Sequence, residues 1–183
     1  MDSNLLIVLA VLAVLVVAGI LLYGRQRSEH LRSRFGPEYE HQVEEKGSRL
    51  KAEADLAQRE KRVAKLSIRP LAPADQDHFL KRWTDVQTRF VDDPPRAVDY
   101  ADALLGEVMS ARGYPVSDFE ERAGDISVDH PTVVNHYRAG HDIAVRHRRG
   151  EAGTEDLRQA MIHYRALFEE LVTERQLADT ASH

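Results

Sequence analysis

The sequence predicts an all-α protein, with an N-terminal transmembrane helix, a charged helical stalk and a small cytoplasmic bundle of about five helices. Nineteen consecutive residues, 5–23, carry no charge. Beyond residue 66, apolar residues recur at intervals of three and four, and no stretch alternates apolar and polar residues over a strand's length. We therefore divide the chain into a flank at 1–4, a membrane span at 5–23, a stalk at 24–66, a bundle at 67–172 and a frayed polar tail at 173–183.

The apolar run from Leu5 to Tyr23 is long enough to cross a bilayer. At 1.5 Å per residue it spans roughly 28 Å, close to the ~30 Å of a hydrocarbon core. A cleavable signal peptide is the alternative, and it would need a basic start and small residues after the run. Residues 1–4 contain no Lys or Arg, and the run ends in bulky side chains. An uncleaved anchor, with Tyr23 at the interface, is therefore the preferred interpretation.

The charges that flank the run predict its orientation. Arg25, Arg27, Arg32 and Arg34 follow it, whereas only Asp2 precedes it. Because basic residues stay on the cytoplasmic side of a span, we expect the N-terminus outside the cell membrane and the rest of the chain in the cytoplasm.

The stalk differs from the body in charge. Residues 24–66 carry eleven Lys and Arg against eight Asp and Glu, and residues 67–183 carry fourteen against twenty-one. Gly36 and Pro37 should interrupt the helix that leaves the membrane. Good helix formers then fill 38–66, which predicts an extended, largely solvated helix. Charged residues on its apolar seam leave open whether it is a spacer or one strand of a weak coiled coil.

Helix start and stop signals divide the body. Pro73 opens the first pattern; Asp93, followed by proline, is an N-cap for the second, and Gly113 fits its C-terminal end. Ser117 begins an S-x-x-E capping box ahead of a short third helix. Two more helices follow, the first ending at Gly150 and the last beginning at Thr154 with the widest apolar face in the chain.

Composition excludes several classes of function. The net charge is −5, whereas nucleic-acid binding favours a basic surface, so no nucleic-acid partner is expected. The absence of cysteine excludes a thiol nucleophile, an iron–sulfur cluster and cysteine-ligated zinc. No nucleotide-binding, hydrolase or kinase motif occurs. We therefore expect no enzyme activity, no cofactor and no small-molecule substrate.

Nine histidines raise the alternative of a metal site. His136 and His141 are five residues apart and so lie on different helix faces, whereas helical zinc sites place ligands three or four apart. A site would need tertiary folding to bring together His130, His136, His141 and His163. The letters HYRA occur at both 136–139 and 163–166, which we attribute to similar helix patterning rather than to duplication.

Five segments carry a resemblance to known sequences: LRSRFGPEYE at 31–40, LSIRPL at 66–71, WTDVQTRFVDDP at 83–94, RGYP at 112–115 and EDLRQAMIHYRALFEELV at 155–172. On these segments the chain resembles a family of single-pass membrane proteins from bacteria with high-GC genomes. The resemblance implies a membrane anchor and implies no reaction, cofactor or catalytic residue. Twenty arginines against five lysines agree with such a source.

An anchor, a stalk and a helical body without catalytic motifs predict a module that binds the lipid bilayer and another protein, as scaffold or regulator. The alternative is a metal-binding or metal-dependent enzyme that uses the four histidines. A third hypothesis, a sensor of membrane stress, lacks an ionisable group within the span. The residues that we expect on an interaction face are Tyr114, Pro115, Phe119, Arg146, Arg148 and Arg149. The arginines among them also suit the last turn of a helix, where cations complement the helix dipole.

Overall fold

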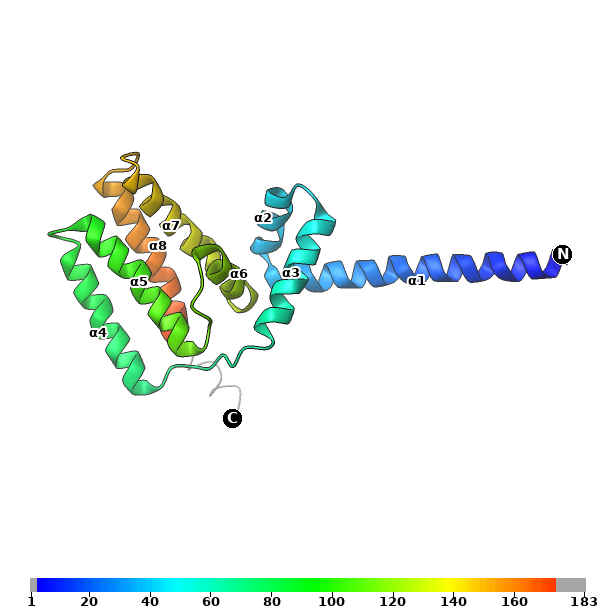
Figure 1. Cartoon of the computed structure of the whole chain (residues 1–183), viewed down its shortest axis with the longest axis horizontal. Coiled ribbons are helices and arrows are strands. Elements are labelled where there is room, and N and C mark those ends of the chain that lie inside the picture. Colours follow the sequence, from blue (N-terminus) through cyan, green and yellow to red (C-terminus); the bar gives the residue numbers. More distant parts are fainter. Residues whose placement is uncertain (1–2, 174–183) are drawn as a thin grey trace. The chain divides into compact units, whose positions relative to one another are not determined.

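The computed structural model describes residues 3–173, and in that range it contains eight helices and no strand, which confirms the all-α class (Figure 1). The chain forms two compact units, Met1–Ala57 and Gln58–His183. The predicted frayed tail lies, apart from Thr173, outside the described residues. The helices are α1 (Ser3–Phe35), α2 (Pro37–Lys46), α3 (Arg49–Val63), α4 (Pro73–Arg89), α5 (Pro94–Arg112), α6 (Phe119–Asp129), α7 (Val134–Arg148) and α8 (Thr154–Thr173).

α1 contains both the apolar run and the arginines that follow it. In the described part of the chain, one helical segment is long and apolar enough to cross a membrane, Val11–Phe35 within α1. The predicted interruption occurs at Gly36, whose φ of 47° lies in the left-handed region, and Pro37 is the first residue of α2.

The stalk differs from the single helix that the sequence predicts between 38 and 66. Gly47 ends α2 with a φ of 59°, and α3 begins two residues later. A glycine in this conformation is a common helix terminus because it has no Cβ to clash with the backbone. Leu31, Phe35 and Tyr39 are almost completely buried within this three-helix unit. The segment is therefore folded, with its own small core.

One buried carboxylate holds the three helices of this unit together. Oε1 of Glu53, in α3, accepts hydrogen bonds from the Ser28 hydroxyl of α1 at 2.5 Å and from the Tyr39 hydroxyl of α2 at 2.8 Å. Arg49 Nε donates to the same oxygen at 2.8 Å from one turn earlier in α3. Burial alone would raise the pKa of Glu53, but the hydrogen bonds from Ser28, Arg49 and Tyr39 outweigh it and hold that pKa below its usual value.

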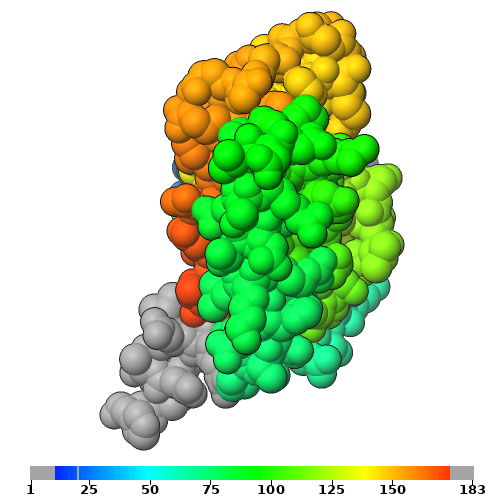
Figure 2. Space-filling view, turned by 90° about the vertical axis from the view of Figure 1, so that its left-hand side faces the viewer, coloured from blue at the N-terminus to red at the C-terminus, as the bar shows by residue number. Residues whose placement is uncertain are grey.

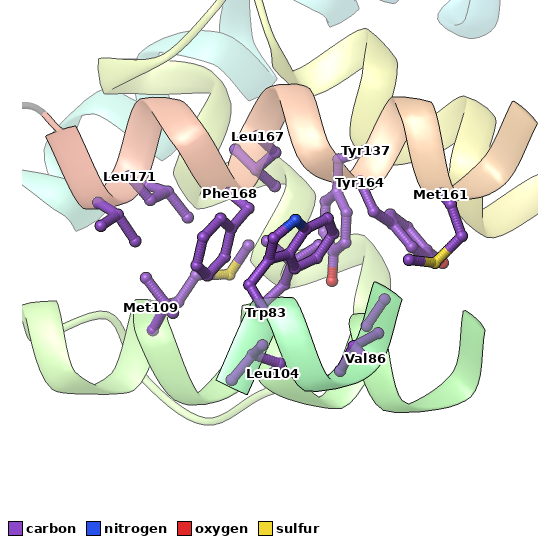
Figure 3. Packing of buried hydrophobic residues seen from close by; sticks show 14 of the residues in the cluster. Trp83, Val86, Leu104, Met109, Tyr137, Met161, Tyr164, Leu167, Phe168 and Leu171 are labelled. Carbon is purple, nitrogen blue, oxygen red and sulfur yellow. The ribbon is translucent and has the colours of Figure 1, made fainter. Parts of the chain in front are cut away.

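The second unit is arranged around α8. α8 packs against α5 and α7, and α4 packs against α5 (Figure 1). Trp83 of α4 stacks on Phe168 of α8, with ring centroids 4.5 Å apart and planes 16° from parallel. Figure 3 shows this pair in the core, with Met109 and Leu171 nearby. Aromatic pairs of this kind add about 0.5–1.5 kcal/mol to the stability that burial of their area provides.

The helix ends in the second unit follow the predicted signals with one correction. The Asp93 side chain caps α5 by accepting from the Arg96 backbone N–H at 3.2 Å. Gly113 ends α5 with a φ of 101°, as expected. The N-cap of α6 is Asp118, which accepts from the Glu121 N–H, rather than Ser117. Asp and Ser are about equally good caps, so sequence alone could not choose between neighbours.

The connection between α3 and α4 is held against the end of α5. The Arg69 backbone N–H donates to the Arg112 carbonyl at 2.9 Å. A Cβ added to Gly113 would lie 2.5 Å from the Ser67 carbonyl oxygen, so only glycine allows this approach.

The C-terminal part of α3 belongs to the second unit. Arg62 forms an ion pair with Asp125 of α6 at 2.5 Å, and Arg59 donates to the Ser127 hydroxyl at 3.4 Å. The Asp125 side chain is almost fully buried, so a charged partner is needed to stabilise it. The division between the units therefore falls inside the predicted stalk.

Candidate functional site

A groove of about 540 Å³ runs between α4, α5 and the segment that follows α5. We call it the α4–α5 groove. Figure 2 shows the side of this unit on which α4 and α5 (green) lie beside the segment after α5 (yellow-green). Most residues that line the α4–α5 groove are apolar or small, and two are charged. The lining residues are Phe79, Ala103, Gly106, Glu107, Ser110, Ala111, Pro115, Val116 and Arg122.

Small residues on α5 create the hollow. Ala103, Gly106 and Ser110 follow one another at intervals of three and four, so they share one face of the helix. The guanidinium of Arg122, in α6, lies over Gly106, where an added Cβ would be only 2.7 Å from Arg122 Nη1. Arg122 Nη2 is also 3.9 Å from Asp102 Oδ2. The groove therefore has a positively charged wall that joins α6 to α5.

A second hollow of about 370 Å³ adjoins the groove and shares Ala103 and Glu107 with it. Arg82 of α4 and Glu107 of α5 form a bidentate ion pair, with Nη2 and Oε1 2.8 Å apart. The hydrogen bonds from Arg82 lower the pKa of Glu107 despite its partial burial. Because Glu107 lines both hollows and Arg82 lines the smaller one, the pair gives an apolar surface a charged border.

Pro115 and Val116 form the exposed edge of the α4–α5 groove, and 89 % of Val116 is accessible to solvent. Pro115 is therefore placed where a partner could contact it, as the sequence suggested. Tyr114 is not available to a partner, because it is buried and its hydroxyl donates to Asp129 Oδ2 at 3.0 Å. Burial raises the pKa of Tyr114, and the charge of Asp129 raises it further. Tyr114 positions the loop rather than contacting a partner.

Phe119 is half-buried and stacks on another ring of its own unit. Its ring centroid is 3.6 Å from that of His141, with planes 9° from parallel, and 4.8 Å from that of Tyr137. Desolvation in this position lowers the pKa of His141. Much of the aromatic surface expected for an interaction face is thus used to join α6 to α7.

The three predicted arginines lie in a different region. Arg146 donates to the Glu151 carbonyl at 3.4 Å, and Arg148 is 3.5 Å from Asp99. Arg149 is exposed at the C-terminal cap of α7. Asp99 lies near the start of α5, whereas Pro115 follows its end, roughly 20 Å away along the helix axis. The six residues expected on an interaction face therefore do not form one surface.

The four candidate metal ligands also separate. His130 is buried, 3.4 Å from Glu170, and desolvation lowers its pKa. His141 lies against Phe119. Only His136 and His163 meet, with 3.0 Å between their Nδ1 atoms. Between residues 3 and 173, no group of three or more His, Asp or Glu side chains is arranged to hold a metal ion.

Sequence reasoning missed the α4–α5 groove, which its small residues could have indicated. Ala103, Gly106 and Ser110 lie away from the apolar stripe of α5 that fills the core. Small residues on an outward helix face leave space, but the neighbouring elements that turn this space into a groove come from tertiary structure.

No family model, curated protein or solved structure matches the chain.

Proposed function

We propose that this protein is a membrane-anchored helical module that binds another protein, as scaffold or regulator. The observation that carries the proposal is the α4–α5 groove, an apolar hollow with a charged border on the surface of a well-packed helical unit. Apolar pockets bordered by polar side chains are typical of the central contact in protein interfaces.

Anchoring is the second part of the proposal. The segment Val11–Phe35 has the length and composition of a membrane span, and its described apolar side chains up to Tyr23 are exposed. Arg25 and Arg27 directly follow the uncharged run, so the positive-inside rule favours a cytoplasmic C-terminal body. A reporter fused to the C-terminus should give a cytoplasmic signal. An extracytoplasmic signal, or loss of an N-terminal tag by cleavage, would contradict the proposed topology.

The composition of the groove indicates what its partner presents. Phe79, Pro115 and Val116 favour an apolar side chain, and Arg122 and Glu107 favour polar groups beside it. A segment with one apolar anchor between charged neighbours has this composition. The groove accounts for binding and gives no indication of catalysis.

Crosslinking with a matched pair of valines tests the groove directly. Val116 lies at its edge, whereas Val91, in the turn between α4 and α5, is 83 % exposed at the other end of the two helices. We would replace each with a photoreactive amino acid in the full chain and irradiate intact cells. We expect a discrete crosslinked protein from position 116 that position 91 does not yield. Equal yields from both positions, or no product from position 116, would contradict the proposed surface.

A substitution in the groove provides the complementary test. Gly106→Leu would displace the flexible end of Arg122 and occupy the hollow there, and Ala103→Glu would place a charge on the floor of the groove. Both variants should keep the helix content of the wild type and lose the product crosslinked from position 116. A variant that folds normally and still gives this product would exclude the groove as the binding site.

A further inference from the structure

Two histidines meet at the surface of the α7–α8 hairpin. His136, in α7, and His163, in α8, have Nδ1 atoms 3.0 Å apart and ring centroids 5.3 Å apart. They are the first letters of the two HYRA segments. α7 and α8 are joined by a turn near Gly150, and the first two residues of each segment lie beside their counterparts, His136 beside His163 and Tyr137 beside Tyr164. The histidines and tyrosines of the two segments therefore occupy neighbouring positions on packed helices.

The adjacent pair of tyrosines fixes the backbone beneath the histidines. Tyr137 and Tyr164 are completely buried, with ring centroids 6.1 Å apart. Gly140 lets the helices approach, because a Cβ there would lie 2.7 Å from the Tyr164 ring. His136 and His163 are therefore presented by two closely packed helices rather than by mobile loops.

The separation of the two nitrogens suits a metal ion. Imidazole nitrogens lie about 2.0–2.1 Å from zinc, so two of them on one ion are roughly 2.9 Å apart at a right angle and roughly 3.3 Å apart in a tetrahedral arrangement. His136 is exposed and His163 is partly exposed, so water can reach the remaining coordination positions. We propose that His136 and His163 form a two-histidine site for a divalent transition-metal ion that prefers imidazole ligands, such as Cu²⁺, Ni²⁺ or Zn²⁺.

The surroundings favour the uncharged form that such an ion needs. Desolvation lowers the pKa of His163, and the neighbouring His136 lowers it further. Metal binding requires both Nδ1 atoms unprotonated, whereas a direct hydrogen bond between the rings requires a proton on one of them. The ion would join α7 to α8 and is independent of the α4–α5 groove, which lies on other elements of the unit.

Copper binding to the full chain in detergent micelles, prepared without a polyhistidine tag, tests the site. Cu²⁺ is the most sensitive probe because it binds nitrogen sites most tightly in this series. We expect one tightly bound equivalent, with electron paramagnetic resonance splitting from two nitrogen ligands. His136→Asn and His163→Asn should each weaken its binding by about tenfold or more, since loss of even an outer-shell partner costs about that much. The matched control is His78→Asn, an exposed histidine of α4, which should leave binding unchanged.

Stability gives a second measurement. Zn²⁺ at about 100 times its dissociation constant should shift the folding equilibrium of the wild type by about 100-fold, and it should not shift that of either variant. Circular dichroism without metal would establish that the variants fold. If His136→Asn binds Cu²⁺ as tightly as the wild type, or if the wild type shows fewer than two nitrogen ligands, the pair is only hydrogen-bonded and the proposal is wrong.

Discussion

Replacing Glu53 with glutamine should destabilise the packing of α1, α2 and α3 in the first unit. The substitution keeps the size of the side chain but removes the charge that accepts the buried bonds from Ser28 and Tyr39. Hydrogen bonds to a charged group contribute about 1.5–3 kcal/mol and neutral ones about 1 kcal/mol, so two bonds lose about 2 kcal/mol. The bond from Arg49, which is 58 % exposed, adds less than about 1 kcal/mol. We therefore expect the free energy of unfolding of this unit to fall by about 2–3 kcal/mol in total.

Hydrogen exchange of the full chain in micelles measures this loss. A change of about 1.4 kcal/mol is tenfold in an equilibrium constant, so amides of α2 should exchange roughly 30- to 150-fold faster in Glu53→Gln. Glu44→Gln, an exposed position of α2, is the matched control and should behave as the wild type. Unchanged exchange in Glu53→Gln, or equal acceleration in both variants, would refute the role assigned to the carboxylate.

The same carboxylate predicts how this unit responds to acid. Because the pKa of Glu53 is lowered by folding, its contribution is complete above the unfolded value of about 4.3 and is lost as the pH falls through the lower, folded value. Protection of α2, corrected for the intrinsic pH dependence of exchange, should decline over that window in the wild type. The same decline in Glu53→Gln would assign it to another group.

Three further outcomes concern the second unit. Phe168→Ala should destabilise it by about 3–5 kcal/mol, measured by urea unfolding with the fluorescence of Trp83, the single tryptophan, as the probe; a loss below about 1 kcal/mol would contradict the packing. Gly113→Ala should cost more than Gly150→Ala, since both have positive φ, at about 1–3 kcal/mol of backbone strain, but only the first would meet a carbonyl of the α3–α4 connection. Because folding lowers the pKa of His130, the unit should lose stability as the pH falls below about 6.5, and His130→Gln should flatten that loss in thermal unfolding; an unchanged slope would exclude His130.

Local signals in the sequence predicted the helical class and several helix ends. Asp93 before proline and Gly113 at a helix terminus act through the backbone of their immediate neighbours, so the residues alone indicate them. Gly47 acts in the same way, but it lies among good helix formers. A lone glycine costs a helix only about 1 kcal/mol, so tertiary contacts decide whether the helix breaks there.

The residues that sequence reasoning misplaced depend on distant partners. Glu53 looked solvated because Ser28 and Tyr39 are 25 and 14 residues away from it. Tyr114 looked like a contact residue because Asp129, which accepts its hydrogen bond, lies on the next helix. His136 and His163 had no helical spacing that would indicate a pair. Each of these contacts exists only after the helices pack.

The loop that carries Pro115 and Val116 is fixed at both ends, by the Tyr114 hydroxyl on one side and the Asp118 cap on the other. Such preorganisation lowers the entropy lost on association, because the exposed side chains already lie in one backbone conformation. Binding at the groove should then resemble the docking of rigid bodies. Its heat-capacity change would be set by the apolar area that is covered, without the larger contribution that accompanies folding of a disordered segment.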